Sequence, residues 1–505
     1  MNARAIFVRF ELSYNIKYGN RLKQTAADCR MNLTNTKAWS NSRIFLILLF
    51  CALIVRTIYL LSSPNIPQYR YFNFDEADYE LIAKNLFEGN GYCYLRGHPT
   101  AFRPPLYPLV VASVYKASGT RNHAAVRWVQ VLLSSATAGL VFLLGLLVFG
   151  RGAGVWAGAI FALYPTMLYY VPKLMTETLF IALLYASLVT VVLAIKRGAA
   201  NLFAAAGLLF GVSFLCRPVL LPFIIGLFVP MMFLLSRRKV IHRTAVCSIA
   251  FLAVFVAAVS PWVIRNYIVF DEFIPTDTHL GWVLWHNTKV HFDFDADFAK
   301  SKREIDQAQA KGKLTSEGFF DAIQRHAHFG VQAQQNGISK AYGPAQVPRT
   351  ETQISRFFVS KAVEFYGQHK FRFVRDRVAN FINFWMPISS IEGRKGKYLY
   401  CYGVIALFAA IGLYLAIKKQ KLIASLPLLL IVANFWIATT LIIYHSRLKM
   451  PADIVTIVFA GYSMDAIRRE KGLKWLLCIA AIAIGLNLIA GLFLLSLKEL
   501  VKAVL

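Results

Sequence analysis

Long apolar runs, separated by short polar and mostly basic stretches, dominate the pattern of this chain. A run of about 20 apolar residues is long enough to cross the hydrocarbon core of a bilayer as a helix. About eleven runs have a workable length, and each predicts one membrane-spanning helix. They cover residues 43–61, 124–149, 153–171, 177–195, 201–216, 218–235, 244–262, 398–417, 422–444, 451–467 and 474–496. The shortest run, 201–216, could instead pair with 218–235 as a single helical hairpin.

The basic residues between these runs predict the orientation of the chain. Residues 1–42 are polar and basic and are interpreted as a cytoplasmic tail; an over-extended start site is the alternative. A cleavable signal peptide would place its apolar stretch earlier, so the first span is expected to remain uncleaved. When the spans alternate from this tail, five basic loops fall on the cytoplasmic side, as the positive-inside rule requires. These loops contain Arg151, Lys196–Arg197, Arg237–Arg243, Lys418–Lys421 and Arg468–Lys471.

This topology divides the chain into four parts, of which the first is the tail 1–42. Residues 43–262 form an N-terminal transmembrane module that includes an external loop at 62–123, and residues 398–505 form C-terminal transmembrane helices. Between them, 263–397 is an external segment. Its stretch 354–385 has an amphipathic basic pattern and is expected to lie on the outer membrane surface. The run His291–Asp297 lacks full calcium-loop spacing, so a solvated strand or turn is favoured.

Composition agrees with an all-α polytopic membrane protein. Of the 505 residues, 57% are hydrophobic and only 16% are charged, which excludes an ordinary soluble protein. The net charge of +29 does not come from a single basic patch, so nucleic acid is not an expected partner. Seven cysteines stand singly, with no paired spacing that would indicate a disulfide framework or a zinc site.

The external stretch from Phe72 to Pro108 carries the most conspicuous candidate chemistry. It begins with the acids Asp75 and Glu76, and it ends with Arg103 before a double proline. Proline is tolerated at a helix start, where free amides can bind phosphate. The acidic and basic ends together indicate a reaction centre at the bilayer surface; a solvated acidic turn is the alternative. Asp78 could instead cap a helix that starts near Tyr79.

Further charges reach the same external face from other spans. Because the positive-inside rule disfavours external cations, single arginines at the ends of several spans call for a reason. A guanidinium group can bind two phosphate oxygens at once, so the binding of a shared anionic ligand would be such a reason. The candidates for phosphate binding are Arg103, Arg217, Arg265 and Arg447. The alternative is interaction with lipid phosphates, and Arg217 before Pro218 could be structural.

Glu177 stands at the external lip of its predicted span as a supporting residue. It could orient an arginine, bind a divalent ion, or favour a helix N-terminus through its charge.

Several motifs in order resemble one family. FDEADY and FRPPLYP in the first external loop, YPTMLYYVPKLMTETL, GLLFGVSFLCRPVLLPF, PWVIRNYIVF and SRLKMPADIVTIVFAG are similar to segments of membrane-embedded GT-C glycosyltransferases. The closest branch is family 39, with its protein mannosyltransferase-like and aminoarabinose transferase-like members. The resemblance extends with gaps from about Asp75 to Gly461, and it implies a GT-C fold and a polyprenyl-phosphate sugar donor.

The chemistry of such a transfer fits these residues. An acceptor hydroxyl needs one base, and the departing lipid phosphate needs positive charge. Asp75 is the expected base, as the resemblance also implies, and the neighbouring Glu76 is expected to position Asp75 or a cation. No cofactor is required by this chemistry, and a divalent cation is possible. The expected site faces the periplasm from a bacterial inner membrane, with undecaprenyl phosphate as carrier and a glycolipid, polysaccharide or protein as acceptor.

Two other functions remain alternatives at this point. A lipid or glycan transporter would also have many spans, but it tends to show internal repeats and charges at mid-membrane. An O-antigen ligase or polymerase would act on lipid-linked glycans outside the membrane, without needing an Asp-Glu pair in the first loop. The sequence shows no repeat and does contain that pair, which favours the transferase.

Overall fold

The computed structural model describes residues 37–63, 74–224, 241–288, 295–326, 330–385, 399–442, 445–482 and 484. Within them, five helices are long and apolar enough to cross a membrane: α2 (Lys37–Leu61), α5 (His123–Val148), α8 (Glu177–Arg197), α11 (Ile241–Phe270) and α20 (Ser446–Lys471). Shorter apolar helices accompany them: α9 (Ala200–Cys216), α18 (Leu399–Lys418), α19 (Leu426–Leu441) and residues 473–482. The expected helical, multi-pass membrane architecture is confirmed. The predicted spans 218–235 and 474–496 lie partly outside the described residues.

The single span predicted for 153–171 is wrong. The chain forms α6 (Arg151–Ala162), turns at Leu163–Tyr164, and then forms the short α7 (Pro165–Tyr170). Pro165 lacks an N–H and cannot continue the hydrogen bonds of α6. The fully buried Arg56 of α2 donates to the carbonyl oxygen atoms of Ala162 and Phe161, at 3.0 and 3.5 Å, at the end of α6. This interruption lets the chain reach the first external loop.

The loop 62–123, which is predicted to be external and is called the first external loop on that ground, folds as helix, hairpin and helix. α3 (Phe74–Phe87) is followed by the short antiparallel strands β1 (Cys93–Leu95) and β2 (His98–Pro99), and then by α4 (Leu106–Ser118). α3 begins at Phe74, about five residues before the helix start predicted near Tyr79, and Asp75 therefore lies in its first turn. α4 begins directly after the double proline, as predicted. Gly89 and Gly91 have φ of +80° and +83°, which allows the turn after α3.

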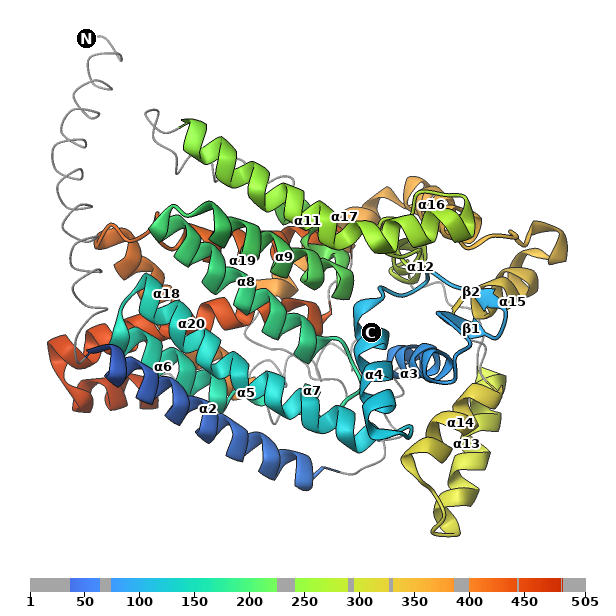
Figure 1. The fold of residues 1–505 in the computed structure, drawn as a ribbon, viewed down its shortest axis with the longest axis horizontal. Helices are drawn as coiled ribbons and strands as arrows, with labels where there is room; N and C mark the ends of the chain where they lie inside the picture. The colour runs from blue at the N-terminus through green and yellow to red at the C-terminus, as the bar shows by residue number, and fades with distance from the viewer. Residues whose placement is uncertain are drawn as a thin grey trace.

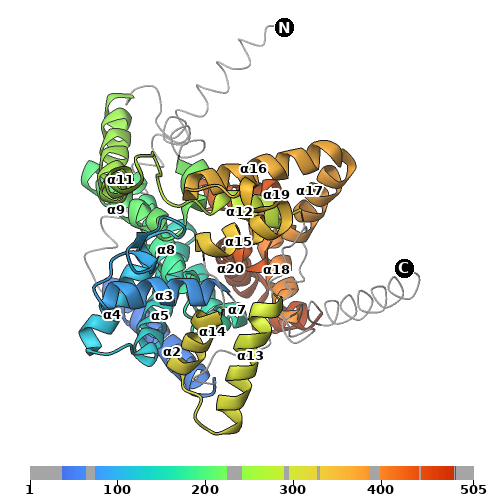
Figure 2. The same cartoon turned by 90° about the vertical axis from the view of Figure 1, so that its right-hand side faces the viewer.

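The external segment is helical and packs against this loop. Its elements are α12 (Leu280–His286), α13 (Asp295–Ala310), α14 (Ser316–His326), α15 (Gly330–Tyr342), the 3₁₀ turn η5 (Pro344–Gln346), α16 (Glu351–Gln368) and α17 (Lys370–Trp385). Figure 2 shows α13 and α14 side by side beneath the other external helices. The amphipathic stretch 354–385 is two helices that meet at His369, and part of the run His291–Asp297 lies outside the described residues.

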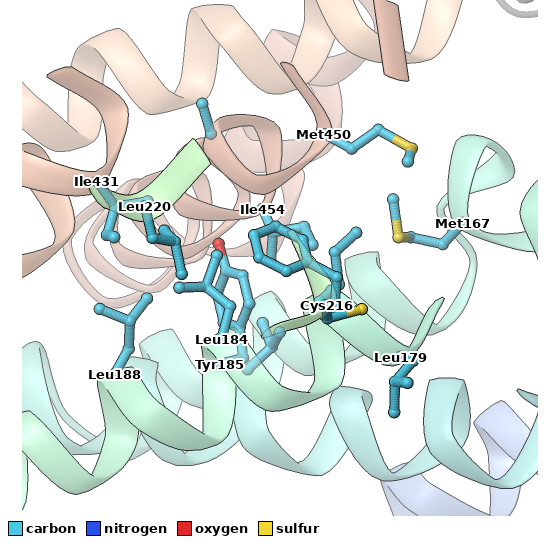
Figure 3. Close-up of a cluster of buried hydrophobic side chains, with 14 of the residues drawn as sticks. Met167, Leu179, Leu184, Tyr185, Leu188, Cys216, Leu220, Ile431, Met450 and Ile454 are labelled. Atoms are coloured by element: carbon cyan, nitrogen blue, oxygen red, sulfur yellow. The ribbon is translucent and has the colours of Figure 1, made fainter. Parts of the chain in front are cut away.

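The helices of the two transmembrane parts share one core. Figure 1 shows α20 crossing between α6, α8 and α18, and Figure 3 shows its residue Ile454 near side chains of α8 and its residue Met450 facing Met167. Tyr185 of α8 donates to the carbonyl oxygen of Pro451 at 2.8 Å. Pro451 has no N–H to donate to the carbonyl oxygen of Arg447 four residues earlier, and its own carbonyl oxygen accepts the tyrosine hydroxyl. The contact joins the third turn of α8 to the second turn of α20.

Close packing of α9 on α11 gives a first prediction. A Cβ on Gly207 would stand 2.2 Å from the Phe251 carbonyl oxygen, so a side chain there forces the two helices apart. We expect Gly207→Ala to destabilise the protein by about 1–3 kcal/mol, the usual effect of overpacking. Thermal unfolding in detergent measures the change. Gly367→Ala in α16 is the matched control, because no atom lies within 4 Å of its added Cβ. Equal stability of the two variants would contradict the prediction.

Candidate active site

Asp75 lies between two arginines that come from distant parts of the chain. Its Oδ1 is 2.5 Å from Nη2 of Arg103, and its Oδ2 is 2.6 Å from Nη1 of Arg447. Asp75 belongs to the first turn of α3, where the helix dipole favours a negative charge. Arg447 stands in the first turn of α20, a helix that the Tyr185 contact joins to α8. The carboxylate thus occupies both of its oxygen atoms with guanidinium groups.

Arg103 is buried and serves a second carboxylate. Its Nε and Nη2 lie 2.9 and 2.5 Å from Oδ2 of Asp78, and its guanidinium lies over the rings of Tyr79 and Phe102. Asp78 therefore pairs with Arg103 inside α3 rather than capping a helix start. Burial raises the pKa of Asp78 to about 6, despite the attraction of Arg103. Near neutral pH this carboxyl is close to taking up a proton.

Glu177 and Arg217 extend the same arrangement. Arg217 Nη1 is 3.2 Å from Glu177 Oε1, and Arg447 Nε is 3.9 Å from the same oxygen. Glu177 is 1% exposed and begins α8, while Arg217 follows α9. We call this set of six residues the charged cluster: Asp75, Asp78, Arg103, Glu177, Arg217 and Arg447. It contains three arginines and three carboxyl groups, so its cations are already neutralised internally.

The electrostatics of Asp75 keep it ionised. Burial alone would raise its pKa, but the guanidinium groups of Arg103 and Arg447 outweigh burial and hold the pKa of Asp75 well below its usual range. Asp75 is therefore in the deprotonated form that a base needs, but its low pKa makes it a weak base. Its basicity would increase if an anion drew the two arginines away.

Glu76 points to a different part of the molecule. Its Oε2 accepts a hydrogen bond of 3.1 Å from the backbone N–H of Leu174, in the turn after α7. Burial raises the pKa of Glu76, while the nearby Lys173 acts in the opposite direction. The structure thus separates the two adjacent acids of the sequence motif. Asp75 joins the charged cluster, whereas Glu76 holds the segment between α7 and α8 against α3.

The structure does not bring Arg265 into the charged cluster. Its Nη1 donates to the carbonyl oxygen of Thr100 at 2.9 Å, and its Nη2 donates to that of Tyr92 at 3.3 Å. The guanidinium also lies over the ring of Trp262, 4.8 Å from its centroid. Arg265 therefore holds the backbone of the first external loop. In the sequence Arg265 looked as strong a candidate as Arg103 and Arg447, and only its partners separate it from them.

His279 is a site residue that the sequence interpretation missed. Its ring packs edge-on against Phe102 at 4.8 Å between centroids, and the charges of Asp75, Arg103 and Arg447 all act on it. Burial lowers the pKa of His279 well below its usual range, and Arg103 adds to the effect. A neutral imidazole therefore stands beside the charged cluster. Nothing in the sequence around His279 distinguishes it from an ordinary loop histidine.

No metal site is evident in the part of the chain that the structure describes. In these residues no group of three or more His, Cys, Asp and Glu side chains has an arrangement that could hold a metal ion. The acids of the charged cluster face arginines instead.

Comparison with known proteins confirms the expected resemblance. Residues 102–264 match the family described as dolichyl-phosphate-mannose-protein mannosyltransferase. This matched region contains Arg103, Glu177 and Arg217, whereas Asp75 and Arg447 lie outside it. No curated protein sequence matches the chain.

Solved oligosaccharyltransferase structures of low sequence identity share the fold. The archaeal oligosaccharyltransferase AglB from Archaeoglobus fulgidus, in complex with an inhibitory peptide and a dolichol-phosphate, matches with a TM-score of 0.50 and 14% identity over 90% of this chain and 54% of its own. The apo form of the Archaeoglobus fulgidus oligosaccharyltransferase gives 0.50 and 14% over 91% and 55%. ArnT from Cupriavidus metallidurans bound to undecaprenyl phosphate gives 0.38 and 12% over 86% and 79%. The chain spans about half the length of the oligosaccharyltransferases.

Proposed function

We propose that this chain, whose residues 102–264 match the dolichyl-phosphate-mannose-protein mannosyltransferase family, transfers a sugar from a polyprenyl-phosphate donor to an acceptor hydroxyl. The observation that carries the proposal is the position of Asp75 between Arg103 and Arg447. One base beside a set of phosphate-binding cations is what such a transfer needs.

The proposed step uses Asp75 as the base. The acceptor oxygen forms a bond to the anomeric carbon of the sugar, and its proton passes to the Asp75 carboxylate. The bond between the anomeric carbon and the phosphate oxygen breaks, and its electron pair leaves with the polyprenyl phosphate. A second carboxylate as nucleophile is unnecessary, because no glycosyl-enzyme forms.

Arg103, Arg447 and Arg217 are the proposed phosphate-binding residues. A carboxylate and a phosphate present similar oxygen acceptors to a guanidinium fork. The lipid phosphate would therefore compete with Asp75 and Glu177 for these arginines. Donor binding would also release Asp75 from its cations, which raises its basicity at the moment when a base is required. Arg265 and Glu76 act in this proposal by holding the external loops.

The proposed orientation places the charged cluster on the external face. The basic loops of the sequence support it, because they accumulate on the opposite side of the alternating spans. In a bacterial inner membrane the donor would be an undecaprenyl-phosphate sugar, and the acceptor a cell-envelope glycolipid such as lipopolysaccharide, a polysaccharide or a protein. The prenyl chain would stay in lipid while its phosphate reaches the arginines.

A reconstituted assay tests this proposal. The purified chain in nanodiscs would receive radiolabelled sugars on polyprenyl phosphate and, in parallel, on polyprenyl diphosphate, together with total envelope glycolipids and proteins as acceptors. We expect label to move to an acceptor from the monophosphate donors. If the diphosphate donors are active and no monophosphate donor is, the proposed donor class is wrong and the donor is a polyprenyl diphosphate. Inactivity with both classes, in a folded protein, would overturn the proposed transfer.

A further inference from the structure

Three segments that are far apart in sequence meet at Glu351, the first residue of α16. Its Oε1 accepts a 2.6 Å hydrogen bond from the hydroxyl of Thr100, and its Oε2 accepts one of 2.8 Å from the backbone N–H of Ala101. The hydroxyl of Thr278 adds a third, at 3.3 Å. One carboxylate thus connects the external segment, the first external loop and the segment that follows α11.

These contacts lie directly beside residues of the candidate active site. Thr100 and Ala101 come three and two residues before Arg103, and Thr278 immediately precedes His279. The backbone N–H of Thr278 also donates to the carbonyl oxygen of Ala101 at 3.0 Å, so the two loops are joined to each other. Glu351 therefore fixes the stretches that carry a cluster arginine and the neighbouring imidazole.

Arg265 of α11 holds the same loop through a second set of hydrogen bonds. It donates to the carbonyl oxygen of Thr100, the residue whose hydroxyl donates to Glu351. It also donates to the carbonyl oxygen of Tyr92, and the Tyr92 hydroxyl in turn donates to the carbonyl oxygen of Arg103 at 2.9 Å. The loop before Arg103 is thus held both by the carboxylate of Glu351 and by the guanidinium of Arg265.

We propose that Glu351 is a positioning residue: it holds the Arg103 loop and the His279 loop in register, so that the external segment sets the geometry of the phosphate-binding arginines. This proposal rests on the proposed function for the role of Arg103. It assigns to α16 a part in donor binding although no α16 side chain belongs to the charged cluster. The Arg103 side chain is buried and packs against Tyr79 and Phe102, so the position of its guanidinium depends on the position of its loop.

The test compares Glu351→Ala, Glu351→Gln and the control Glu364→Ala. Glu364 is an exposed acid of the same helix that pairs only with Lys361 among the contacts described. We expect Glu351→Ala to raise the KM for the polyprenyl-phosphate sugar by about tenfold or more, with a smaller change in kcat. A tenfold change in KM corresponds to roughly the free energy of one buried polar contact. Glu351→Gln should stay near the wild-type KM, because its amide oxygen can accept from Ala101 and its NH₂ can donate to the Thr100 hydroxyl.

Hydrogen exchange supplies a readout that does not depend on activity. In the full-length protein, Glu351→Ala should speed amide exchange at residues 100–103 and 276–279, whereas Glu364→Ala should not. A folded Glu351→Ala protein with wild-type exchange at both loops would overturn the proposal. Faster exchange without sugar transfer by the wild-type protein would instead overturn the proposed function and leave the positioning role supported. Faster exchange with an unchanged KM would overturn the link to donor binding.

Discussion

Asp75→Asn is expected to lower sugar transfer by about 10²–10⁴-fold, the usual contribution of a general base, without weakening the binding of polyprenyl phosphate. The amide cannot accept the acceptor proton, so the chemical step is lost. At the same time Arg103 and Arg447 lose a competing carboxylate, which lies 2.5 and 2.6 Å from them. Phosphate affinity should therefore stay equal or increase. Few substitutions at an active site combine lost turnover with tighter product binding.

The measurement separates the two effects. Transfer is followed with labelled donor, and binding is followed by titrating undecaprenyl phosphate without sugar into the protein in nanodiscs. Asp271→Asn is the matched control, since Asp271 is exposed and its φ of +54° suits asparagine as well as aspartate. Wild-type transfer by a folded Asp75→Asn protein would exclude Asp75 as the base. Weaker phosphate binding would show that Asp75 organises the arginines rather than competing for them.

Arg103→Ala is expected to destabilise the protein by about 3–5 kcal/mol, because removal of one partner leaves a buried charge uncompensated. The Arg103 side chain is only 7% exposed, and it is the cation nearest to Asp78. The effect should depend on pH. The folded-state pKa of Asp78, about 6, already exceeds the ordinary aspartate value, and loss of Arg103 would raise it further. The stability linked to this proton is present at low pH and is lost as pH rises through the folded pKa.

Thermal unfolding of the variant at pH 5 and pH 8 tests this expectation. The Arg103→Ala protein should be closer to wild type at pH 5, where Asp78 carries a proton, and furthest from it at pH 8. The double variant Arg103→Ala/Asp78→Asn should recover part of the lost stability, and its deficit relative to wild type should depend less on pH than that of Arg103→Ala. A deficit that is the same at both pH values, or that the double variant does not reduce, would mean that Asp78 is not the uncompensated charge.

The sequence was sufficient to predict most of the helices, but not their continuity. Apolar runs identify where α2, α5, α8 and α20 lie, because lipid demands such runs. The break between α6 and α7 was missed, since the run 153–171 is apolar throughout and the residue that satisfies the end of α6 is Arg56, about a hundred residues earlier. The division into a catalytic module, an external segment and C-terminal helices stays a prediction.

The candidate site was predictable as a set of charges, but not as a set of neighbours. Alternating spans placed Asp75, Arg103, Glu177, Arg217 and Arg447 on one face, and the structure brings these five together. The alternation of spans also placed Arg265 on that face. Its partners are backbone carbonyl groups, which every residue has, so the sequence could not identify them. His279 and Glu351 were missed for a related reason. Their importance comes from the loops that they touch, and their own surroundings in the chain are ordinary.

The position of Arg56 also has a consequence for how the protein is made. During synthesis α2 leaves the ribosome first, and an arginine in a membrane helix costs up to about 2.5–3.5 kcal/mol on the insertion scale. Its partners, the Ser134 hydroxyl on α5 and the carbonyl groups at the end of α6, emerge roughly 80 and 105 residues later. Arg56 therefore gains these hydrogen bonds only after α5 and α6 have been synthesised.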